Sequence, residues 1–160
     1  IERAAALHDI GKLAVPDTVL NKETPLDAKE QRAYEWHAER TAQFLRAMEF
    51  TGNLRGVEEI APYHHRKYGG GGYPAEGPSG EALPLGARII AVADGLWVLE
   101  TSRWGAQAKS REKALEEIRL RAGTDFDPKV VNALLQVAPQ LTDLLQGATC
   151  RIRFQEGGAK

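Results

Sequence analysis

Residues 85 to 99 constrain the fold most, because this stretch is apolar nearly all the way round a helix. Pro84 precedes it, as proline often does at the start of a helix. A helix that is apolar on every side is usually buried, so we expect this one at the centre of the domain. Asp94 lies in its middle. A carboxylate in that position needs a cation or several hydrogen-bond donors.

The rest of the chain also predicts helices, separated by loops. Asp27 and Glu30 form a capping box for one helix, and Asp127 with Pro128 begins another. The glycine- and proline-rich residues 66 to 80 cannot form a helix or a strand. The helices are expected at residues 1 to 9, 27 to 48, 57 to 65, 84 to 99, 110 to 121 and 127 to 135 or beyond, a loop at 13 to 25, and an edge strand at 150 to 154. The fold class is therefore all-α, with about six or seven helices.

Length and composition favour one globular domain at residues 1 to 147, followed by a tail at 148 to 160. A chain of 160 residues can bury its own core. Its formal net charge of −1 argues against a nucleic acid polymer as partner. One cysteine excludes an internal disulfide. There is no secretory signal, and no apolar run near the roughly 20 residues of a membrane span. We expect a cytoplasmic domain without membrane contact. It begins inside a helix, which suggests a missing upstream part.

The histidines and two aspartates fall on inward positions. His8 shares a helical face with Ile1, Ala4 and Ala5, and Asp9 follows it. A second stripe contains a histidine and consists of Ala33, His37, Thr41, Phe44 and Met48. A single buried histidine is more often a hydrogen-bonded core residue than a ligand. Six such groups together suit a divalent metal such as iron, manganese, zinc or nickel: His8, Asp9, His37, His64, His65 and Asp94. Two metals sharing a carboxylate could hydrolyse a phosphoester.

Four stretches, in order, resemble one known family. Residues 7 to 12, Leu-His-Asp-Ile-Gly-Lys, resemble the HD motif of metal-dependent phosphohydrolases. Residues 64 to 74 resemble the second motif of the HD-GYP subfamily, and residues 80 to 94 and 126 to 131 continue it. The resemblance covers about residues 1 to 137. It implies an all-helical HD-domain bundle with two or three metal ions in its core. Such domains linearise cyclic di-GMP and are often attached to a sensory or receiver domain.

The resemblance also implies roles for individual residues. The six candidate ligands match the metal ligands of the family, with Asp9 as the carboxylate that bridges two metals. Lys12 matches a lysine beside the scissile phosphate. The substrate would be contacted by the loop that gives the family its name and by an arginine that binds phosphate or guanine. These positions are Gly72, Tyr73, Pro74 and Arg103.

Several positions depart from the family pattern. The usual glutamate after the paired histidines is Arg66, and an aspartate before the Gly-Tyr-Pro stretch is Gly69. An aspartate after Asp94 is replaced by Trp97. A basic residue and a glycine are replaced by Ala106 and Thr41. The family's helix before the first motif, which supplies a further histidine, is not in this sequence.

Two hypotheses follow from these observations. The first is a metal-dependent phosphodiesterase that hydrolyses cyclic di-GMP or a related cyclic dinucleotide. The second is a degenerate HD-GYP module that binds nucleotide or a partner protein and regulates without turnover. A third, weaker alternative is a phosphohydrolase of another nucleotide. Retained ligands favour the first hypothesis, whereas Gly69, Trp97 and Ala106 favour the second.

Overall fold

The structure, a computed structural model, describes residues 1 to 48, 56 to 102 and 104 to 147, with side chains to residue 140. The described part contains eight α-helical segments and no strand. Two of these segments, α2 and α5, are single turns of four residues. Six longer helices remain, which confirms the predicted all-α class. The helices are α1 Glu2–Leu7, α2 Asp17–Leu20, α3 Ala28–Glu35, α4 His37–Ala47, α5 Val57–Ile60, α6 Leu85–Glu100, α7 Arg111–Leu120 and α8 Pro128–Gly147. Three 3-10 helices join them, η1 Ile10–Ala14, η3 Ala61–Tyr63 and η4 Gly80–Ala82. The predicted strand at 150 to 154 lies outside the described residues.

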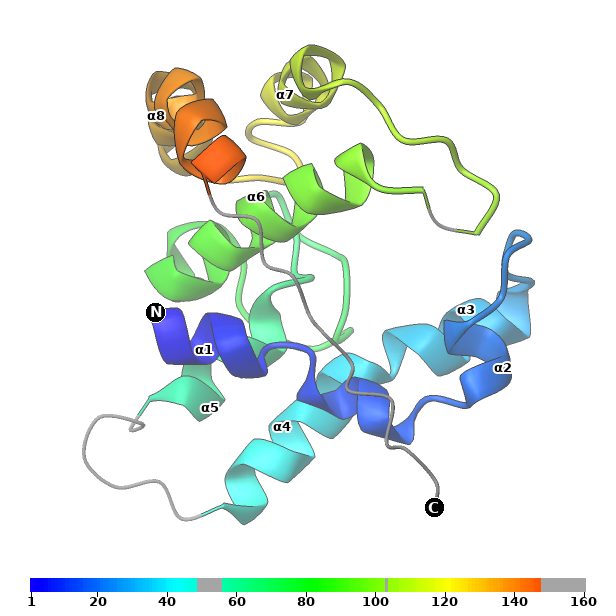
Figure 1. Cartoon of the computed structure of the whole chain (residues 1–160). Coiled ribbons are helices and arrows are strands. Elements are labelled where there is room, and N and C mark those ends of the chain that lie inside the picture. The colour runs from blue at the N-terminus through cyan, green and yellow to red at the C-terminus, as the bar shows by residue number, and fades with distance from the viewer. Residues whose placement is uncertain (49–55, 103, 148–160) are drawn as a thin grey trace, which may run out of the picture.

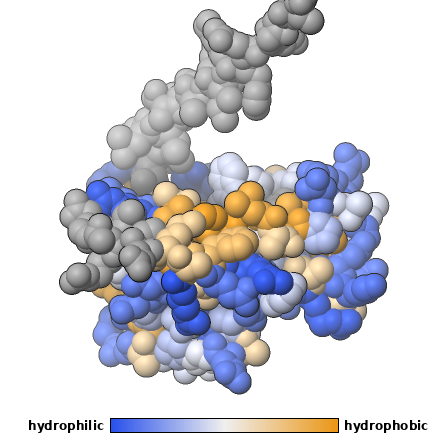
Figure 2. Space-filling view, turned by 90° about the horizontal axis from the view of Figure 1, so that it is seen from below, coloured by the Kyte–Doolittle hydropathy of each residue, from blue (hydrophilic) through white to orange (hydrophobic). Residues whose placement is uncertain are grey.

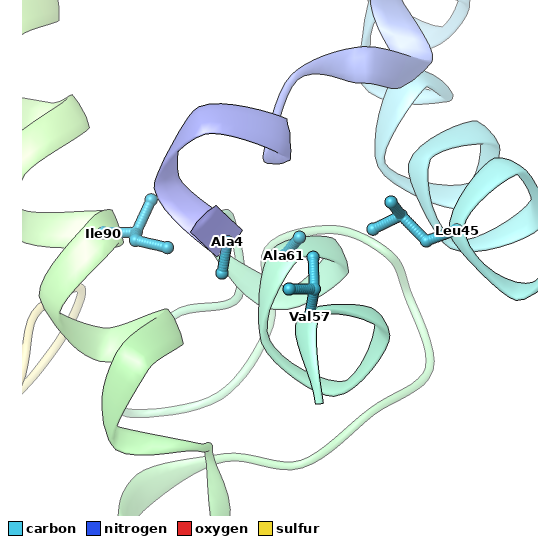
Figure 3. Packing of buried hydrophobic residues seen from close by; sticks show 5 residues of the cluster. All are labelled: Ala4, Leu45, Val57, Ala61 and Ile90. Atoms are coloured by element: carbon cyan, nitrogen blue, oxygen red, sulfur yellow. The ribbon is translucent and has the colours of Figure 1, made fainter. Parts of the chain in front are cut away.

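Helix α6 is the central element, as its composition predicts. It crosses the middle of the molecule, with α7 and α8 on one side and α5 and η3 on the other (Figure 1). Its Ile90 packs with Ala4, Leu45, Val57 and Ala61, and Figure 3 shows that these five side chains come from five different elements. The next core cluster, on the α7–α8 side, is Val92, Ile118, Phe126 and Val131. Helix α6 therefore joins two halves of the core.

The expectation that α6 is buried all round is wrong for one stripe. Leu85 and Trp97 are 53% and 64% exposed, and Ala93 between them is exposed as well. Leu85 and Ala93 are eight residues apart, and Ala93 and Trp97 are four apart, so these residues lie on the same side of the helix. The elements packed on α6 leave this face uncovered in the described part of the chain. Apolar side chains also form a band across the face seen in Figure 2. No described helix is both long and apolar enough to cross a membrane.

The helix predicted at residues 27 to 48 is divided into α3 and α4. The capping box of Asp27 and Glu30 is present as predicted. The division falls at Trp36, where the carbonyl of Tyr34 accepts a hydrogen bond from the ring of His37. On α4 the prediction also erred at the end of the buried stripe, since Leu45 is fully buried and Met48 is 45% exposed.

Two further predictions need correction. The loop expected at 13 to 25 contains η1 and the short helix α2, whose Val19 is buried against Val15 and Tyr34. The helix expected at 57 to 65 changes after Ile60 into η3, where Pro62 occupies one of the first two positions. Proline lacks the N–H that a longer α-helix would need. Of the residues 66 to 80 predicted to form neither helix nor strand, residues 66 to 79 form neither, and the short 3-10 helix η4 begins at Gly80.

Candidate metal centre

Three histidine rings are oriented by the same kind of local hydrogen bond. The Nδ1 atoms of His8, His37 and His64 lie 2.5, 2.6 and 2.7 Å from the carbonyl oxygens three residues earlier. A carbonyl oxygen can only accept, so each Nδ1 carries the proton. In a neutral ring, Nε2 is then left with a free lone pair, which is the arrangement of most metal-binding histidines. Each ring is thus fixed by the turn on which it sits.

The two oxygens of Asp9 face different groups. Oδ1 lies 3.3 Å from Nε2 of His37 and 3.7 Å from Nε2 of His64. Oδ2 lies 3.3 Å from Nε2 of His8 and forms an ion pair with Lys12. Asp9 therefore stands between two clusters of groups, the geometry expected of a carboxylate that bridges two cations.

Four of the predicted ligands form one tight cluster. Ligand atoms of Asp9, His37, His64 and His65 all lie within 4.8 Å of one another. Two ligands on opposite sides of one metal ion are about 4 to 4.4 Å apart. Oδ1 of Asp9 and Nε2 of the three histidines are buried and have no hydrogen-bond partner among the described residues. Unpaired buried polar atoms are costly, so this cluster fits a divalent cation that would satisfy all four.

The other two predicted ligands lie at the edge of this cluster. The ring of His8 is 4.7 Å from the ring of His64. Asp94, on α6, lines the same pocket as His64 and His65, and its charge helps to raise the pKa of His8. His37 lies with His64 and His65 near Oδ1 of Asp9, whereas His8 lies near Oδ2.

The protonation states suit a cation site. Burial lowers the pKa of His64, and lowers that of His65 well below its usual value. Both rings are therefore neutral near pH 7. Burial alone would raise the pKa of Asp9, but the neighbouring imidazoles and Lys12 outweigh it, and the pKa lies far below its usual value. Lys12 also has a raised pKa, since its bond to Asp9 outweighs its burial. The site therefore holds an ionised Asp9 beside the neutral rings of His64 and His65.

Gly11 and Thr41 hold the HD turn against α4. A Cβ on Gly11 would lie 2.0 Å from the carbonyl oxygen of His37 and 2.5 Å from the nitrogen of Thr41. Gly11 thus permits a close backbone contact. Helix α1 ends at Leu7, two residues before the end predicted for the first helix. The hydroxyl of Thr41 accepts from the Gly11 N–H and donates to the carbonyl of His8, both at 3.0 Å.

A pocket of about 450 Å³ opens beside the cluster. It reaches the cluster through His64 and His65, and its other side carries Lys67 and Arg121. Both cations bind the carboxylate of Asp125, at 3.0 and 2.5 Å. The volume lies in the range of pockets for small molecules and cofactors. A molecule bound in this pocket would touch three of the six candidate metal ligands, His64, His65 and Asp94.

The predicted substrate residues have different positions. Gly72 and Tyr73 line the pocket, and the Tyr73 ring lies 4.4 Å from that of His65. Pro74 is half-buried next to them. Lys12 lies at Asp9 and 5.4 Å from the centre of the Tyr34 ring. Arg103 lies outside the described residues.

Sequence reasoning did not assign several residues of the site. Tyr34 and Trp104 line the pocket with their rings 4.6 Å apart. Arg66 also lines it and is almost fully buried. A signal for Arg66 was present, because an arginine inside a glycine- and proline-rich stretch can donate to carbonyls that lack backbone partners. Tyr34 gave none, since an aromatic residue on a buried stripe is ordinarily core.

The departures from the family pattern are accommodated. Trp97 lies on the exposed stripe of α6. Gly69 packs closely on the turn at residues 123 and 124, where a Cβ would meet the Thr124 carbonyl oxygen at 3.0 Å. Ala106 lines a separate pocket with Trp104. None of these three removes a candidate metal ligand.

Comparison with known proteins agrees with this geometry. The chain is 40% identical over 144 residues to the cyclic di-GMP phosphodiesterase response regulator RpfG of Xanthomonas campestris, which covers 90% of this chain and 38% of that protein. It is 35% identical over 136 residues to the 3'3'-cGAMP-specific phosphodiesterase 2 of Vibrio cholerae, with 85% and 26% covered. A cyclic di-GMP phosphodiesterase of Thermotoga maritima is 34% identical over 146 residues, with 90% and 39% covered. The chain thus spans less than half the length of these relatives.

The family itself is shown by a match to most of the chain. The profile of the HD domain family matches residues 1 to 130. This range includes every described element from α1 to α7 and the beginning of α8. It also includes all six candidate ligands. The chain therefore belongs to the HD domain family, and its motifs together with its relatives place it in the HD-GYP group of that family.

Proposed function

We propose that this domain is a metal-dependent phosphodiesterase that hydrolyses cyclic di-GMP or a related cyclic dinucleotide. The observation that carries the proposal is the cluster of four buried, unpaired ligand atoms of Asp9, His37, His64 and His65 beside an open pocket. The names of the relatives, which are cyclic di-GMP and 3'3'-cGAMP phosphodiesterases, support the substrate class. A module that had lost its metals would gain nothing from keeping this costly arrangement.

The residues suggest how metal ions would be held. One ion would bind Oδ1 of Asp9 with His37, His64 and His65. A second would bind on the side of Oδ2, where His8 lies and Asp94 is near. Two or three ions of iron, manganese, zinc or nickel suit such nitrogen and oxygen donors. When bound, they would supply Lewis-acid activation of water and of the phosphodiester.

The chain's own side chains would prepare the substrate. Lys12 remains protonated because its pKa is raised, so it can stabilise charge that develops on the phosphate. Tyr73, with its ring against His65, forms one wall of the pocket. Lys67 and Arg121 carry positive charge at the other wall, where they favour an anionic substrate.

We further propose that this domain is attached to a sensory or receiver domain upstream, which would regulate it. The relatives are two to four times longer than the part matched here, and one of them is named a response regulator. A domain at residues 1 to 147 with a tail at 148 to 160, and a cytoplasmic location, stay predictions.

The test is metal analysis followed by turnover. The protein is purified, its metal content is measured, and hydrolysis of cyclic di-GMP and 3'3'-cGAMP is followed with manganese or iron. We expect bound metal and a linear dinucleotide product. Asp9→Ala should lose both, because Asp9 faces both candidate metal positions. Nucleotide binding without turnover under any divalent metal would instead support the regulatory alternative.

A further inference from the structure

Arg66 uses its side chain in an unusual way. It is only 7% exposed, and it directs its N–H groups at four carbonyl oxygens of one short segment. Nη1 donates to Pro74 at 3.0 Å and to Ala75 at 2.9 Å, Nη2 donates to Gly77 at 3.0 Å, and Nε donates to Pro78 at 3.2 Å. A guanidinium has five N–H donors, so four of the five are occupied by residues 74 to 78.

The segment that receives these bonds has little else to hold it. Among the described residues, no backbone–backbone hydrogen bond involves residues 74 to 78. Two of the five residues are prolines, which lack an N–H. Backbone bonds close the chain on either side, from Tyr73 to the His65 carbonyl at 3.3 Å and from Gly80 to the Tyr68 carbonyl at 2.7 Å. Within these limits, the guanidinium of Arg66 takes the place of a backbone partner.

The held segment borders the candidate site. Tyr73 comes directly before it and packs against His65, 4.4 Å between ring centres, and 5.8 Å from His37. Gly77 packs on the other side against Tyr63, whose ring a Cβ would meet at 3.0 Å. Arg66 itself follows His65 in the chain and lines the pocket. Arg66 therefore connects the histidine pair to the segment that follows Tyr73.

We propose that Arg66 is a positioning residue, which holds residues 74 to 78 and keeps Tyr73 against His65, so that the pocket has a fixed wall for the substrate. Arg66 is not a phosphate ligand, because nearly all its donors are spent on carbonyl oxygens. A glutamate at this position would have no donor for these carbonyls. This chain thus fixes the loop with a group that the usual glutamate could not supply. The proposal depends on the proposed function only for its kinetic readout.

The test compares Arg66→Met, Arg66→Lys and the control Arg88→Met. Methionine keeps much of the volume but has no donor, and lysine has three donors on one atom. Arg88 is another largely buried arginine, but its bond goes to Asp127 at 2.6 Å and not to residues 74 to 78. All three variants lose stability if burial of the charge is what matters. Only the Arg66 variants should loosen the loop.

The first readout needs no activity. Glu76 is exposed in the held segment, so a glutamate-specific protease reports loop opening by cleavage after it. We expect Arg66→Met to be cut there about tenfold faster than the parent protein, Arg66→Lys less, and Arg88→Met at the parent rate. The second readout is kinetic. Arg66→Met should raise KM by about tenfold or more with its metal content unchanged, because misplaced substrate contacts weaken binding.

The outcomes separate the two proposals. Equal cleavage after Glu76 in Arg66→Met and the parent protein overturns the positioning role, as does an unchanged KM. Loss of metal in Arg66→Met would also overturn it, since the residue would then support the ligands and not the loop. If Arg66→Met does not fold, Arg66→Lys decides by the same readouts. If the parent protein shows no turnover, the proposed function fails, while faster cleavage of the Arg66 variants still supports the loop contact.

Discussion

The two sides of the candidate site are held by different kinds of interaction. On the near side, η1 and α4 meet through backbone atoms at Gly11, and three histidine rings bind carbonyls three residues away. On the far side, Arg66 ties residues 74 to 78, and Lys67 and Arg121 both bind Asp125. Backbone bonds are present there as well, from Tyr68 and Gly69 to the turn before α8.

This difference separates two tasks. The near side must place ligand atoms, and short backbone contacts leave little room for movement. The far side must receive a substrate, and long charged side chains can hold a loop that has few backbone partners. We expect changes on the near side to have large effects that do not depend on salt or pH. Changes on the far side should be smaller and should depend on both.

The largest effect should come from Gly11→Ala, which places a methyl group at the closest contact of the near side. The new Cβ would lie 2.0 Å from a backbone oxygen of α4, and backbone atoms cannot move aside as a flexible side chain can. We expect a loss of about 3 kcal/mol in the free energy of unfolding, with loss of bound metal. Chemical denaturation and metal analysis measure both.

The control for this change is Leu13→Ala in the same turn. Leu13 is 83% exposed, so its truncation should change stability by no more than about 0.5 kcal/mol. Should Gly11→Ala be as mild as Leu13→Ala, the close approach of η1 to α4 does not hold the near side together.

Lys12→Ala tests whether Lys12 supports the metal ligands of the near side or acts only on the substrate. A protonated ammonium has no lone pair for a metal, so the variant should keep its metal content. It should lose roughly a hundredfold in the rate of hydrolysis, because a donor to the developing phosphate charge is removed. Single-turnover kinetics beside metal analysis separates these effects. Lys22→Ala, at a lysine paired with Glu30 in another part of the surface, should leave both unchanged. Loss of metal in Lys12→Ala would show that Lys12 helps to place the metal ligands of the near side.

Local rules predicted parts of the fold and of the near side. The capping box at Asp27 is present, and α6 is central as its apolar character predicts, although one stripe of it is exposed. The inward stripe also placed His37 and Thr41 correctly, since both are fully buried. The motif spacing then named the residues that the fold brings together at the cluster. Helical periodicity decides which face points inward, and this is enough to bring the histidines near one another.

The remaining features depend on tertiary contacts that no local rule contains. The role of Gly11 as a site of close approach requires α4, thirty residues away in the chain, to lie against it. The exposed stripe of α6 depends on how many elements pack around that helix. The glycine- and proline-rich stretch gave a signal for Arg66, but the carbonyls of residues 74 to 78 that it binds could be named only from the structure. Such contacts are decided by the packing of whole elements, so hydrophobic periodicity and turn signals in the sequence cannot predict them.

Thr41→Val should show a moderate effect on the near side. Valine keeps the shape but removes the hydroxyl that accepts from the Gly11 N–H and donates to the His8 carbonyl. A buried N–H left without a partner costs about 2 kcal/mol. Because these two bonds flank Asp9, we also expect metal affinity to fall by about tenfold. Thr41→Ser, which keeps the hydroxyl, should retain metal affinity. Equal losses in both variants would show that packing of the methyl group, and not the hydrogen bonds, matters.

The smallest effect should come from Asp125→Asn on the far side. Its loss of stability should depend on pH, which distinguishes it from the changes on the near side. Burial tends to raise the pKa of Asp125, but the hydrogen bonds from Lys67 and Arg121 outweigh it and lower the pKa. A lowered pKa in the folded state means that the ionised carboxylate stabilises the fold. This contribution is complete above the unfolded pKa of about 3.9 and is lost as the pH falls through the folded pKa. At pH 7 the variant should therefore be less stable by about 1 kcal/mol, and in acid the two proteins should converge.

Salt sharpens the same comparison. The side chains of Lys67 and Arg121 are 49% and 40% exposed, so added salt should screen their attraction to Asp125. The difference in unfolding free energy between the parent protein and Asp125→Asn should shrink from low to high salt. For Gly11→Ala the corresponding difference should stay constant with salt and with pH, since overlap of backbone atoms involves no charge. A salt-independent Asp125→Asn difference would mean that the backbone bonds of Tyr68 and Gly69, and not the ion pairs, hold the far side.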